Sequence, residues 1–301
     1  MNKLTIAVLY GGNSPERAVS LVTGKAVIDN LDPKKYEVSV YDTAKDLKKL
    51  VDNSEAIDLA FIALHGEGGE DGTIQGLLQL LDIPYTFSGL LPSAIAMDKA
   101  MTKRLLSAAG VKVAGGQEVN AVEDIEFKNF PAVVKPNSAG SSVAISIVNN
   151  LDETKIAVKV ALEYDPVVLI EEYLVGTEIT VATLGNLKPK ALPVIEIVPQ
   201  KGKFYDYASK YEPGGSIHHI PARIDHGIAK IAQDIAVKCH LTLGLGGAAR
   251  TDMIITNDGP VVLEINTIPG MTPTSLLPEA AKAAGIAFPA LLDKLIALAQ
   301  E

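Results

Sequence analysis

The chain is poor in cysteine and in positive charge, and it contains no long apolar stretch. Its single cysteine, Cys239, cannot form an intrachain disulfide, and its helical apolar surroundings predict a buried, reduced thiol. No segment approaches the roughly 18 continuous apolar residues that a membrane span requires. The strand-like run Leu4–Tyr10 is too short for the apolar part of a signal peptide. We therefore expect a cytoplasmic protein that does not bind membranes.

Positive charge is scarce, because 27 Lys and Arg residues face 36 Asp and Glu residues and the net charge is −9. A general nucleic-acid binder needs a basic surface, so we expect no nucleic-acid partner. A local basic pocket for a phosphate ligand remains compatible with this balance. Two common nucleotide-binding patterns are also missing, namely the Walker A spacing and a Gly-x-Gly-x-x-Gly run after the first strand.

The 301 residues, of which 48% are apolar, are enough for two or three domains. The first part alternates strand-like and helix-like segments, which is typical of a parallel sheet with helices on both faces. A long helix over Ser93–Ala109 is expected to leave this domain. Further along, short strands followed by helices favour α+β packing.

The most informative segment is a predicted hairpin with strand-like runs at Thr251–Thr256 and Pro260–Glu264. A three-residue loop at 257–259, with a left-handed glycine and a bulge, would pair Asp252 with Glu264. A two-residue loop would shift the register by one residue and turn Asp252 away. Asn266 lies two residues beyond Glu264 and therefore shares its face.

Two carboxylates and an amide, with no His or Cys nearby, form a hard-oxygen cluster that suits magnesium. A solvated hairpin face is the alternative, but the neighbouring strand residues are apolar, which favours acids set into a core. The sequence therefore predicts a magnesium site at Asp252, Glu264 and Asn266.

Two other segments are candidates for nucleotide binding. The loop Gly140-Ser141-Ser142 follows Lys135, so backbone N–H groups, hydroxyls and an ammonium could hold phosphate oxygens. An ordinary turn is the alternative. The run from Glu171 to Leu174, with Glu178 beyond it, could contact adenine and ribose, or it could be a set of exposed acids at a strand end.

Substrate candidates follow the first and third predicted strands. Gly11-Gly12 ends the first strand and is followed by Glu16, and the run His65–Gly72 follows the third. Ligands of open parallel sheets bind beyond the carboxyl ends of the strands, so these segments predict a substrate site at one sheet edge. A flexible acidic turn is the alternative for the second segment.

Taken together, these segments resemble the D-alanine–D-alanine ligases of the ATP-grasp superfamily, and the match covers nearly the whole chain. Each motif is modest alone, but their order and spacing are specific. The resembling segments are Gly11–Arg17, His65–Gly72 with Gln75-Gly76, Ala96–Lys99, Lys135-Pro136 with Gly140–Val143, Phe204–Tyr207 with Lys210-Tyr211, Arg250 with Asp252, and Glu264–Thr272 with Ser275-Leu276.

The resemblance implies an ATP-grasp fold of α/β and α+β type, in which ATP lies between two antiparallel sheets. An N-terminal parallel-sheet domain over 1–95 would bind substrate. A central subdomain over 96–182 and a C-terminal subdomain over 183–301, which carries the metal site, would hold the nucleotide. Relatives are commonly homodimers.

The implied reaction is the ATP-dependent ligation of two D-alanines through an acyl phosphate, for peptidoglycan precursor synthesis. Two magnesium ions, or manganese in their place, would bridge the phosphates on the hairpin ligands. The residues expected to contact ATP are Lys99, Lys135, Ser142, Glu171, Glu172, Tyr173, Leu174, Glu178 and Lys210.

The resemblance also assigns the substrate roles. Glu16 would hold the ammonium of the first D-alanine with His65 near its carboxylate, and Ser275 would hold the carboxylate of the second. Arg250 and the Gly270 backbone N–H would stabilise the oxyanion. A closing loop over 200–215 would exclude water, and its Tyr211 would link to Ser141 and Glu16.

Several positions depart from the family pattern, and the alternatives to a D-Ala–D-Ala ligase stay open. A D-Ala–D-lactate or D-Ala–D-Ser ligase, a ligase of another carboxylate, and a nucleotide-binding relative without ligase activity are the rivals; Tyr211 favours the dipeptide. An alanine at 144 replaces a usual glycine and predicts a stiffer phosphate loop. The departures are Ala18, Phe87, Ala139, Ala144 and Ala208.

Overall fold

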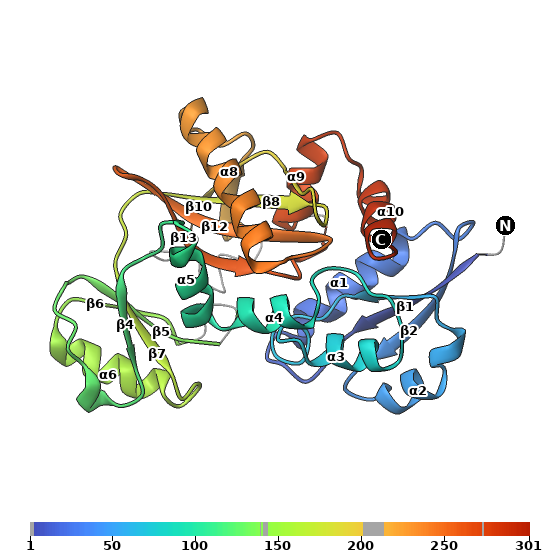
Figure 1. Ribbon diagram of the computed structural model, residues 1–301, viewed down its shortest axis with the longest axis horizontal. Helices are drawn as coiled ribbons and strands as arrows, with labels where there is room; N and C mark the ends of the chain where they lie inside the picture. The colour runs from blue at the N-terminus through green and yellow to red at the C-terminus, as the bar shows by residue number, and fades with distance from the viewer. Residues whose placement is uncertain (1–2, 139, 141–143, 201–213, 273) are drawn as a thin grey trace.

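The computed structural model describes residues 3–138, 140, 144–200, 214–272 and 274–301. The chain forms three regions in sequence order, each built on its own sheet (Figure 1). The expected mixed architecture, with one parallel sheet and two antiparallel sheets, is confirmed. Within the described ranges no helix combines the length and the apolar character needed to cross a bilayer.

The N-terminal region is a parallel sheet with strand order β2-β1-β3. Its central residues Ile6–Leu9 and the whole of β3 are buried, as expected for parallel strands covered on both faces. The elements are β1 (Leu4–Tyr10), α1 (Arg17–Asn30), β2 (Tyr36–Asp42), α2 (Leu47–Asp52), η1 (Ser54–Ala56), β3 (Leu59–Ile62) and α3 (Thr73–Leu80).

Two helices, α4 (Leu90–Met97) and α5 (Lys99–Ala108), stand where the sequence predicted one, so that expectation is wrong. The break lies at Asp98, whose backbone is extended. Its carboxylate accepts a hydrogen bond from the Met101 backbone N–H at 2.8 Å and thereby caps α5. The new start places Lys99 in the first turn of α5.

The central region is a four-stranded antiparallel sheet with order β4-β7-β5-β6. Helix α6 covers one face, where Val134 and Ile170 pack with its Val158. Strand side chains alternate, so Lys135 and Glu171 lie on the opposite face, which is the one that meets Lys103 of α5. The elements are β4 (Gly116–Val119), η2 (Val122–Asp124), β5 (Ala132–Pro136), β6 (Ser146–Val148), α6 (Leu151–Ala161) and β7 (Val168–Glu172).

The C-terminal region is a six-stranded sheet with order β11-β10-β8-β12-β13, with β9 also paired to β8. The boundary expected at 182/183 falls inside β8, which pairs with β12 along its whole length. The elements are β8 (Thr177–Leu184), β9 (Lys190–Ala191), β10 (Ile195–Pro199), β11 (Ser216–His219), α8 (His226–Leu243), β12 (Ala248–Thr256), β13 (Gly259–Asn266), α9 (Leu276–Ala283) and α10 (Phe288–Leu298).

The last helix packs the C-terminal region against the N-terminal one. Asp293 on α10 accepts hydrogen bonds from Lys35 Nζ at 2.6 Å and from the Tyr36 hydroxyl at 2.8 Å. Apolar residues of both regions share one buried cluster. Helix α10, near the C-terminal end of the chain, therefore lies beside α1 (Figure 1).

The hairpin of β12 and β13 has a shorter turn than the sequence predicted. Thr256 pairs with Gly259, so the turn holds only Asn257 and Asp258, and the three-residue loop is wrong. Gly259 has a positive φ of 102°, as expected for the glycine of this turn.

Asp252 nevertheless pairs with Glu264, as predicted. Met253 pairs with Val262, which leaves Leu263 as an extra residue on β13. This β-bulge shifts the register by one residue and compensates for the shorter turn. The predicted pairing of Asp252 with Glu264 is confirmed, but a bulge beyond the turn produces it.

Two of the departures from the family pattern occupy backbone conformations that favour glycine. Phe87 has φ 72° and Ala144 has φ 54°, both in the left-handed region that strains residues with a Cβ. Phe87 is buried, and its ring meets Phe61 edge-on with centroids 5.8 Å apart. The core packing of this ring offsets part of the backbone cost.

A buried histidine predicts that the fold loses stability in mild acid. His240 on α8 is fully buried, and its Nδ1 lies 2.8 Å from Thr183 Oγ1. Burial lowers the pKa of His240 from 6.5 to about 4. On acidification His240 is therefore protonated near pH 6.5 in the unfolded chain, but only near pH 4 in the folded chain.

The free energy of unfolding should fall from pH 6.5 toward pH 4, with this histidine contributing on the order of 3 kcal/mol of the loss. Urea unfolding of the protein and of its His240→Gln variant across this range measures the effect. The variant should lose less stability than the parent on acidification. Equal acid losses in the two proteins would contradict the prediction.

Candidate active site

A cavity of about 560 Å³ lies where the three regions meet. Its walls come from the loops after β1 and β3, from the start of α5, from the glycine loop after β5 and from the end of β13. It brings together many of the predicted site residues from distant parts of the chain. The predicted residues that line it are Glu16, His65, Lys99, Arg250, Glu264, Asn266, Gly270 and Ser275.

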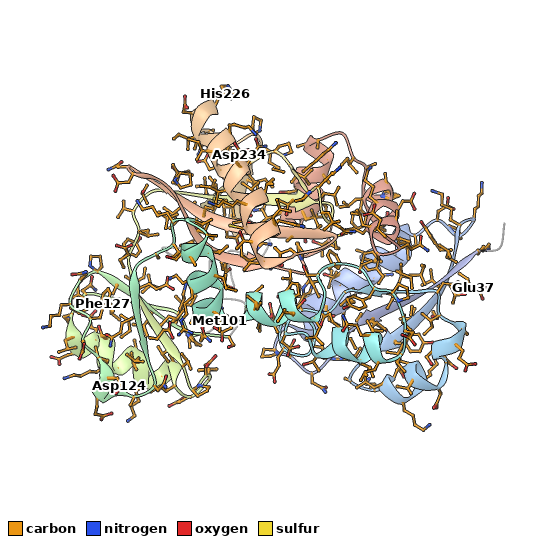
Figure 2. The ribbon with its side chains drawn as sticks, in the orientation of Figure 1. Glu37, Met101, Asp124, Phe127, His226 and Asp234 are labelled. Carbon is orange, nitrogen blue, oxygen red and sulfur yellow. The ribbon has the colours of Figure 1, made fainter. Side chains whose placement is uncertain are left out.

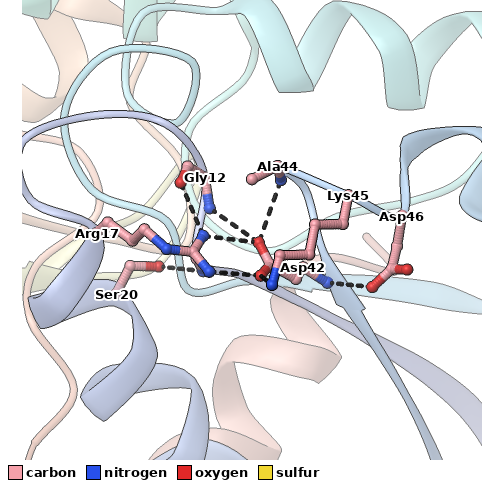
Figure 3. Close-up of polar contacts among 8 residues, drawn as sticks. Gly12, Arg17, Ser20, Asp42, Ala44, Lys45 and Asp46 are labelled. Atoms are coloured by element: carbon pink, nitrogen blue, oxygen red, sulfur yellow. Dashed lines mark hydrogen bonds and ion pairs between the residues drawn. The ribbon is translucent and has the colours of Figure 1, made fainter.

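An ion pair fixes the loop that carries Glu16 (Figure 3). Arg17 donates to both carboxylate oxygens of Asp42, at 2.8 and 2.6 Å, and to the Gly12 carbonyl at 2.8 Å. The backbone N–H groups of Gly12 and Ala44 also point to Asp42. The hydrogen bonds from Arg17 hold the pKa of Asp42 at about 2, so the carboxylate is charged at neutral pH. The pair ties the end of β1 to the end of β2.

The Glu16 side chain lies between two glycines from different regions. A methyl group on Gly66 would overlap Glu16 Oε2, and one on Gly140 would lie 2.7 Å from the same oxygen. Ser14 closes the wall by donating to the His65 carbonyl at 2.7 Å. The absence of a Cβ at both glycines therefore makes room for the carboxylate.

His65 is buried and bonded on both ring nitrogens. Its Nε2 lies 3.0 Å from Thr23 Oγ1, and its Nδ1 lies 3.3 Å from Glu70 Oε1. Burial raises the pKa of Glu70, and the negative charge of Glu16 adds to this rise. Glu70 lines the cavity, although the sequence pointed only to the His65–Gly72 run that contains it.

A second cluster lies on the face of the central sheet that is turned away from α6. Lys135 Nζ lies 2.9 Å from Glu171 Oε2, and Lys103 Nζ lies 2.5 Å from Glu171 Oε1. All three side chains are largely buried. The sequence pointed to Lys135 and Glu171 but missed Lys103, although its position four residues after Lys99 places both lysines on one face of α5.

The other residues predicted to contact ATP continue from β7 into β8. Glu172 is exposed and accepts a hydrogen bond from the Gly115 N–H at 2.9 Å. Tyr173 follows β7 directly and its N–H donates to the Pro131 carbonyl at 3.1 Å, and Leu174 is the next residue. Glu178 lies on β8 opposite Ile254. Of the predicted acids, Glu171 alone belongs to the buried lysine cluster described above.

The predicted metal ligands share one face of the hairpin. Asp252 pairs with Glu264, and Arg250 pairs with Asn266. Arg250 donates to both oxygens of Asp252, at 2.8 and 2.9 Å, and Thr180 donates to Asp252 at 2.6 Å. This arrangement fixes the Asp252 carboxylate.

The oxygens on this face fit a magnesium ion. Asn266 Oδ1 is buried and has no hydrogen-bond partner among the described residues. An unpaired buried amide oxygen is costly unless a ligand meets it. No three His, Cys, Asp or Glu side chains of the described chain gather as a metal site. The predicted site would therefore depend on the Asn266 amide beside the two carboxylates.

The last predicted wall lies at the start of α9. Ser275 is the residue before this helix, and its Oγ lies 2.7 Å from Thr272 Oγ1 and accepts from the Thr272 N–H at 3.1 Å. A methyl group on Gly270 would lie 2.9 Å from Ser275 Oγ. Carboxylates are favoured at such helix starts by the unpaired N–H groups and the helix dipole.

Several predicted residues lie outside the described part of the chain. They include catalytic candidates, ATP contacts and two of the departures from the family pattern. These residues are Ala139, Ser141, Ser142, Ala208, Lys210 and Tyr211.

Two family descriptions match the sequence. The "D-ala D-ala ligase C-terminus" family covers residues 110–297, and the "D-ala D-ala ligase N-terminus" family covers residues 5–54 and 43–88. The D-alanine–D-alanine ligase of Syntrophobacter fumaroxidans is 49% identical over 99% of this chain and 98% of its own length. The D-alanine–D-alanine ligase of Pelotomaculum thermopropionicum is 46% identical over 99% of this chain and 97% of its own length.

Solved structures give the same result. The Bacillus anthracis D-alanine–D-alanine ligase complexed with ATP superposes with a TM-score of 0.86 at 36% identity, covering 99% of this chain and 97% of that one. The VanG D-Ala:D-Ser ligase of Enterococcus faecalis superposes with a TM-score of 0.85 at 33% identity, covering 99% of this chain and 100% of that one. The expected ATP-grasp architecture is therefore confirmed, and the chain belongs to the D-alanine–D-alanine ligase family.

Proposed function

We propose that this protein joins two D-alanines into D-alanyl-D-alanine, with conversion of ATP to ADP and phosphate, to supply peptidoglycan synthesis. The observation that carries the proposal is the shared cavity, where Glu16, Lys99, Arg250 and Ser275 converge from distant parts of the chain. These residues offer a carboxylate for an ammonium, cations for phosphate and oxyanion, and a hydroxyl for a carboxylate.

The first step activates the first D-alanine. Glu16 holds its ammonium, and His65, whose ring Thr23 and Glu70 orient, lies beside its carboxylate. A carboxylate oxygen attacks the γ-phosphorus of ATP, the bond to the β-γ bridging oxygen breaks, and ADP leaves. Lys99 and Lys135 stabilise the charge on the phosphates.

The second step forms the peptide bond. The amine of the second D-alanine, held by its carboxylate at Ser275, attacks the acyl carbonyl and loses a proton, and inorganic phosphate leaves. Arg250 and the Gly270 N–H hold the oxyanion of the tetrahedral intermediate, and removing such a donor typically costs a few kcal/mol of barrier. The buried Asp252 keeps the Arg250 guanidinium in one orientation.

Asp252, Glu264 and Asn266 would hold magnesium. The ion supplies positive charge that neutralises the phosphates when it is bound. The unpaired Asn266 oxygen supports this assignment.

A D-Ala–D-Ser ligase is the second candidate, because the D-Ala:D-Ser ligase of Enterococcus faecalis superposes about as well as the D-alanine ligase from Bacillus anthracis. The relatives at 45–49% identity carry the dipeptide name, which favours D-alanine as the second substrate.

Phosphate release with ATP and magnesium decides between these functions. We expect release with D-Ala alone, and dipeptide as the product by mass spectrometry. Release that needs D-Ser or D-lactate in addition would identify the sister ligases. The absence of any D-Ala-dependent release would contradict the proposal. A homodimer is also proposed from the family, and light scattering of the purified chain tests it.

A further inference from the structure

In the cluster of Lys103, Glu171 and Lys135, two lysines share one carboxylate, and the proposed reaction gives Lys103 no role. Each ammonium contacts a different oxygen of the single carboxylate, at 2.5 Å for Lys103 and 2.9 Å for Lys135. The side chains are 13%, 5% and 9% exposed in the order Lys103, Glu171, Lys135. Ion pairs with this little exposure are weakly screened by solvent, so each partner strongly affects the others.

The cluster joins the two sides of the proposed nucleotide site. Lys135 and Glu171 stand on the central sheet, while Lys103 comes from α5, which packs against α8 and β13 of the C-terminal region. Figure 2 labels Met101 on α5 and shows this helix between the two sheets. Lys99, one helical turn before Lys103, lines the cavity.

The charges of the cluster explain why a second lysine is needed. Burial disfavours the Glu171 carboxylate, but the charges of Lys135 and Lys103 outweigh burial and lower its pKa. Burial lowers the pKa of Lys103, and the attraction of the Glu171 carboxylate opposes this shift only in part. With both lysines charged the cluster carries one net positive charge, which is available to an anionic ligand. With one lysine the cluster would be neutral, because the charge of the remaining ammonium would be balanced by the Glu171 carboxylate.

We propose that Lys103 is a positioning residue for nucleotide binding. By pairing with one oxygen of Glu171, it limits Lys135 to the other oxygen and leaves part of the Lys135 charge available to the ATP phosphates. This inference rests on the proposed function. Lys103 acts through Glu171 and does not itself touch the nucleotide. Without Lys103, Glu171 would draw Lys135 into a closer pair, and ATP would have to compete with a buried carboxylate for its cation.

The test measures the dissociation constant of ATP with magnesium, without D-alanine, by calorimetry. Lys103→Met should raise this constant by about tenfold or more, which is typical of losing a buried charge partner. Lys103→Arg keeps the charge and should retain most of the affinity. Lys48→Met is the control, because Lys48 forms an exposed pair with Asp52 on α2 and should change nothing.

A double-variant cycle separates positioning from a merely structural role. In a Glu171→Gln background no carboxylate competes for Lys135, so Lys103→Met should then weaken ATP binding far less than it does in the parent. An equal loss in both backgrounds, or unchanged affinity in Lys103→Met, would overturn the inference. If Lys103→Met does not fold, Lys103→Gln takes its place in the same cycle.

The outcome is independent of the assay of the proposed function. ATP affinity is measured without turnover, so a parent protein that binds ATP but releases no phosphate with D-alanine would contradict the reaction and leave the cycle readable. For active variants, we expect the KM for ATP to rise and the KM for D-alanine to stay within about twofold, since Lys103 lies in the nucleotide cluster.

Discussion

Replacing Glu264 by glutamine is expected to lower kcat for dipeptide formation about a hundredfold or more. Glu264 faces Asp252 across the hairpin and shares the cavity with Asn266. The substitution keeps the shape of the side chain but removes one of two carboxylate charges, so magnesium would bind more weakly and neutralise the phosphates less. The measurement is phosphate release as a function of magnesium concentration at saturating ATP and D-alanine.

Asp258→Asn is the matched control for this variant. Asp258 is an exposed acid in the turn of the same hairpin, so its replacement removes the same charge away from the cavity. It should leave turnover and the magnesium requirement within about twofold of the parent. If Glu264→Gln kept both at parental values, Glu264 would not be a metal ligand.

Replacing Gly66 by alanine is expected to lower kcat/KM for D-alanine about a hundredfold, while ATP binding stays near parental. The added methyl group would overlap Glu16 Oε2 and displace the carboxylate proposed to hold the first substrate. A shift of about 1 Å in a positioning group is enough for a loss of this size. Steady-state kinetics with D-alanine as the varied substrate measures it.

Gly68→Ala is a close control two residues away. Gly68 has φ 77° and Gly66 has φ 69°, so alanine has a similar backbone cost at both positions. A methyl group on Gly68 would meet nothing within 4 Å. We expect Gly68→Ala to lower thermal stability slightly and to leave kcat/KM within a few-fold of the parent. Equal kinetic losses in the two variants would show that backbone strain, and not contact with Glu16, is responsible.

In the hairpin of β12 and β13, the local sequence pattern predicted the strand pairing correctly but not the turn length. Strand alternation alone placed Glu264 and Asn266 on one face, and the pairing of Asp252 with Glu264 is as predicted. The turn length was wrong, because a two-residue turn and a bulge at Leu263 give the same register as the expected three-residue loop. Turn and bulge compensate for each other, and no local residue preference distinguishes the two solutions.

The helix break at Asp98 was missed for a different reason. Apolar periodicity continues through it, and a single predicted helix satisfies that pattern. A capping residue stands directly before Lys99, so a signal for a new helix start was present and was outweighed by the periodicity.

The sequence by itself determined the family motifs, the types of group available and most of the strand and helix pattern, because these depend on residues near one another in the chain. Only the tertiary structure decided which groups meet. Glu171 lies 68 residues beyond Lys103 in the sequence, and nothing near either residue indicates their contact. Burial, shared charge and shifted pKa values arise from such distant contacts, so the lysine cluster and the unpaired oxygen of Asn266 required the fold.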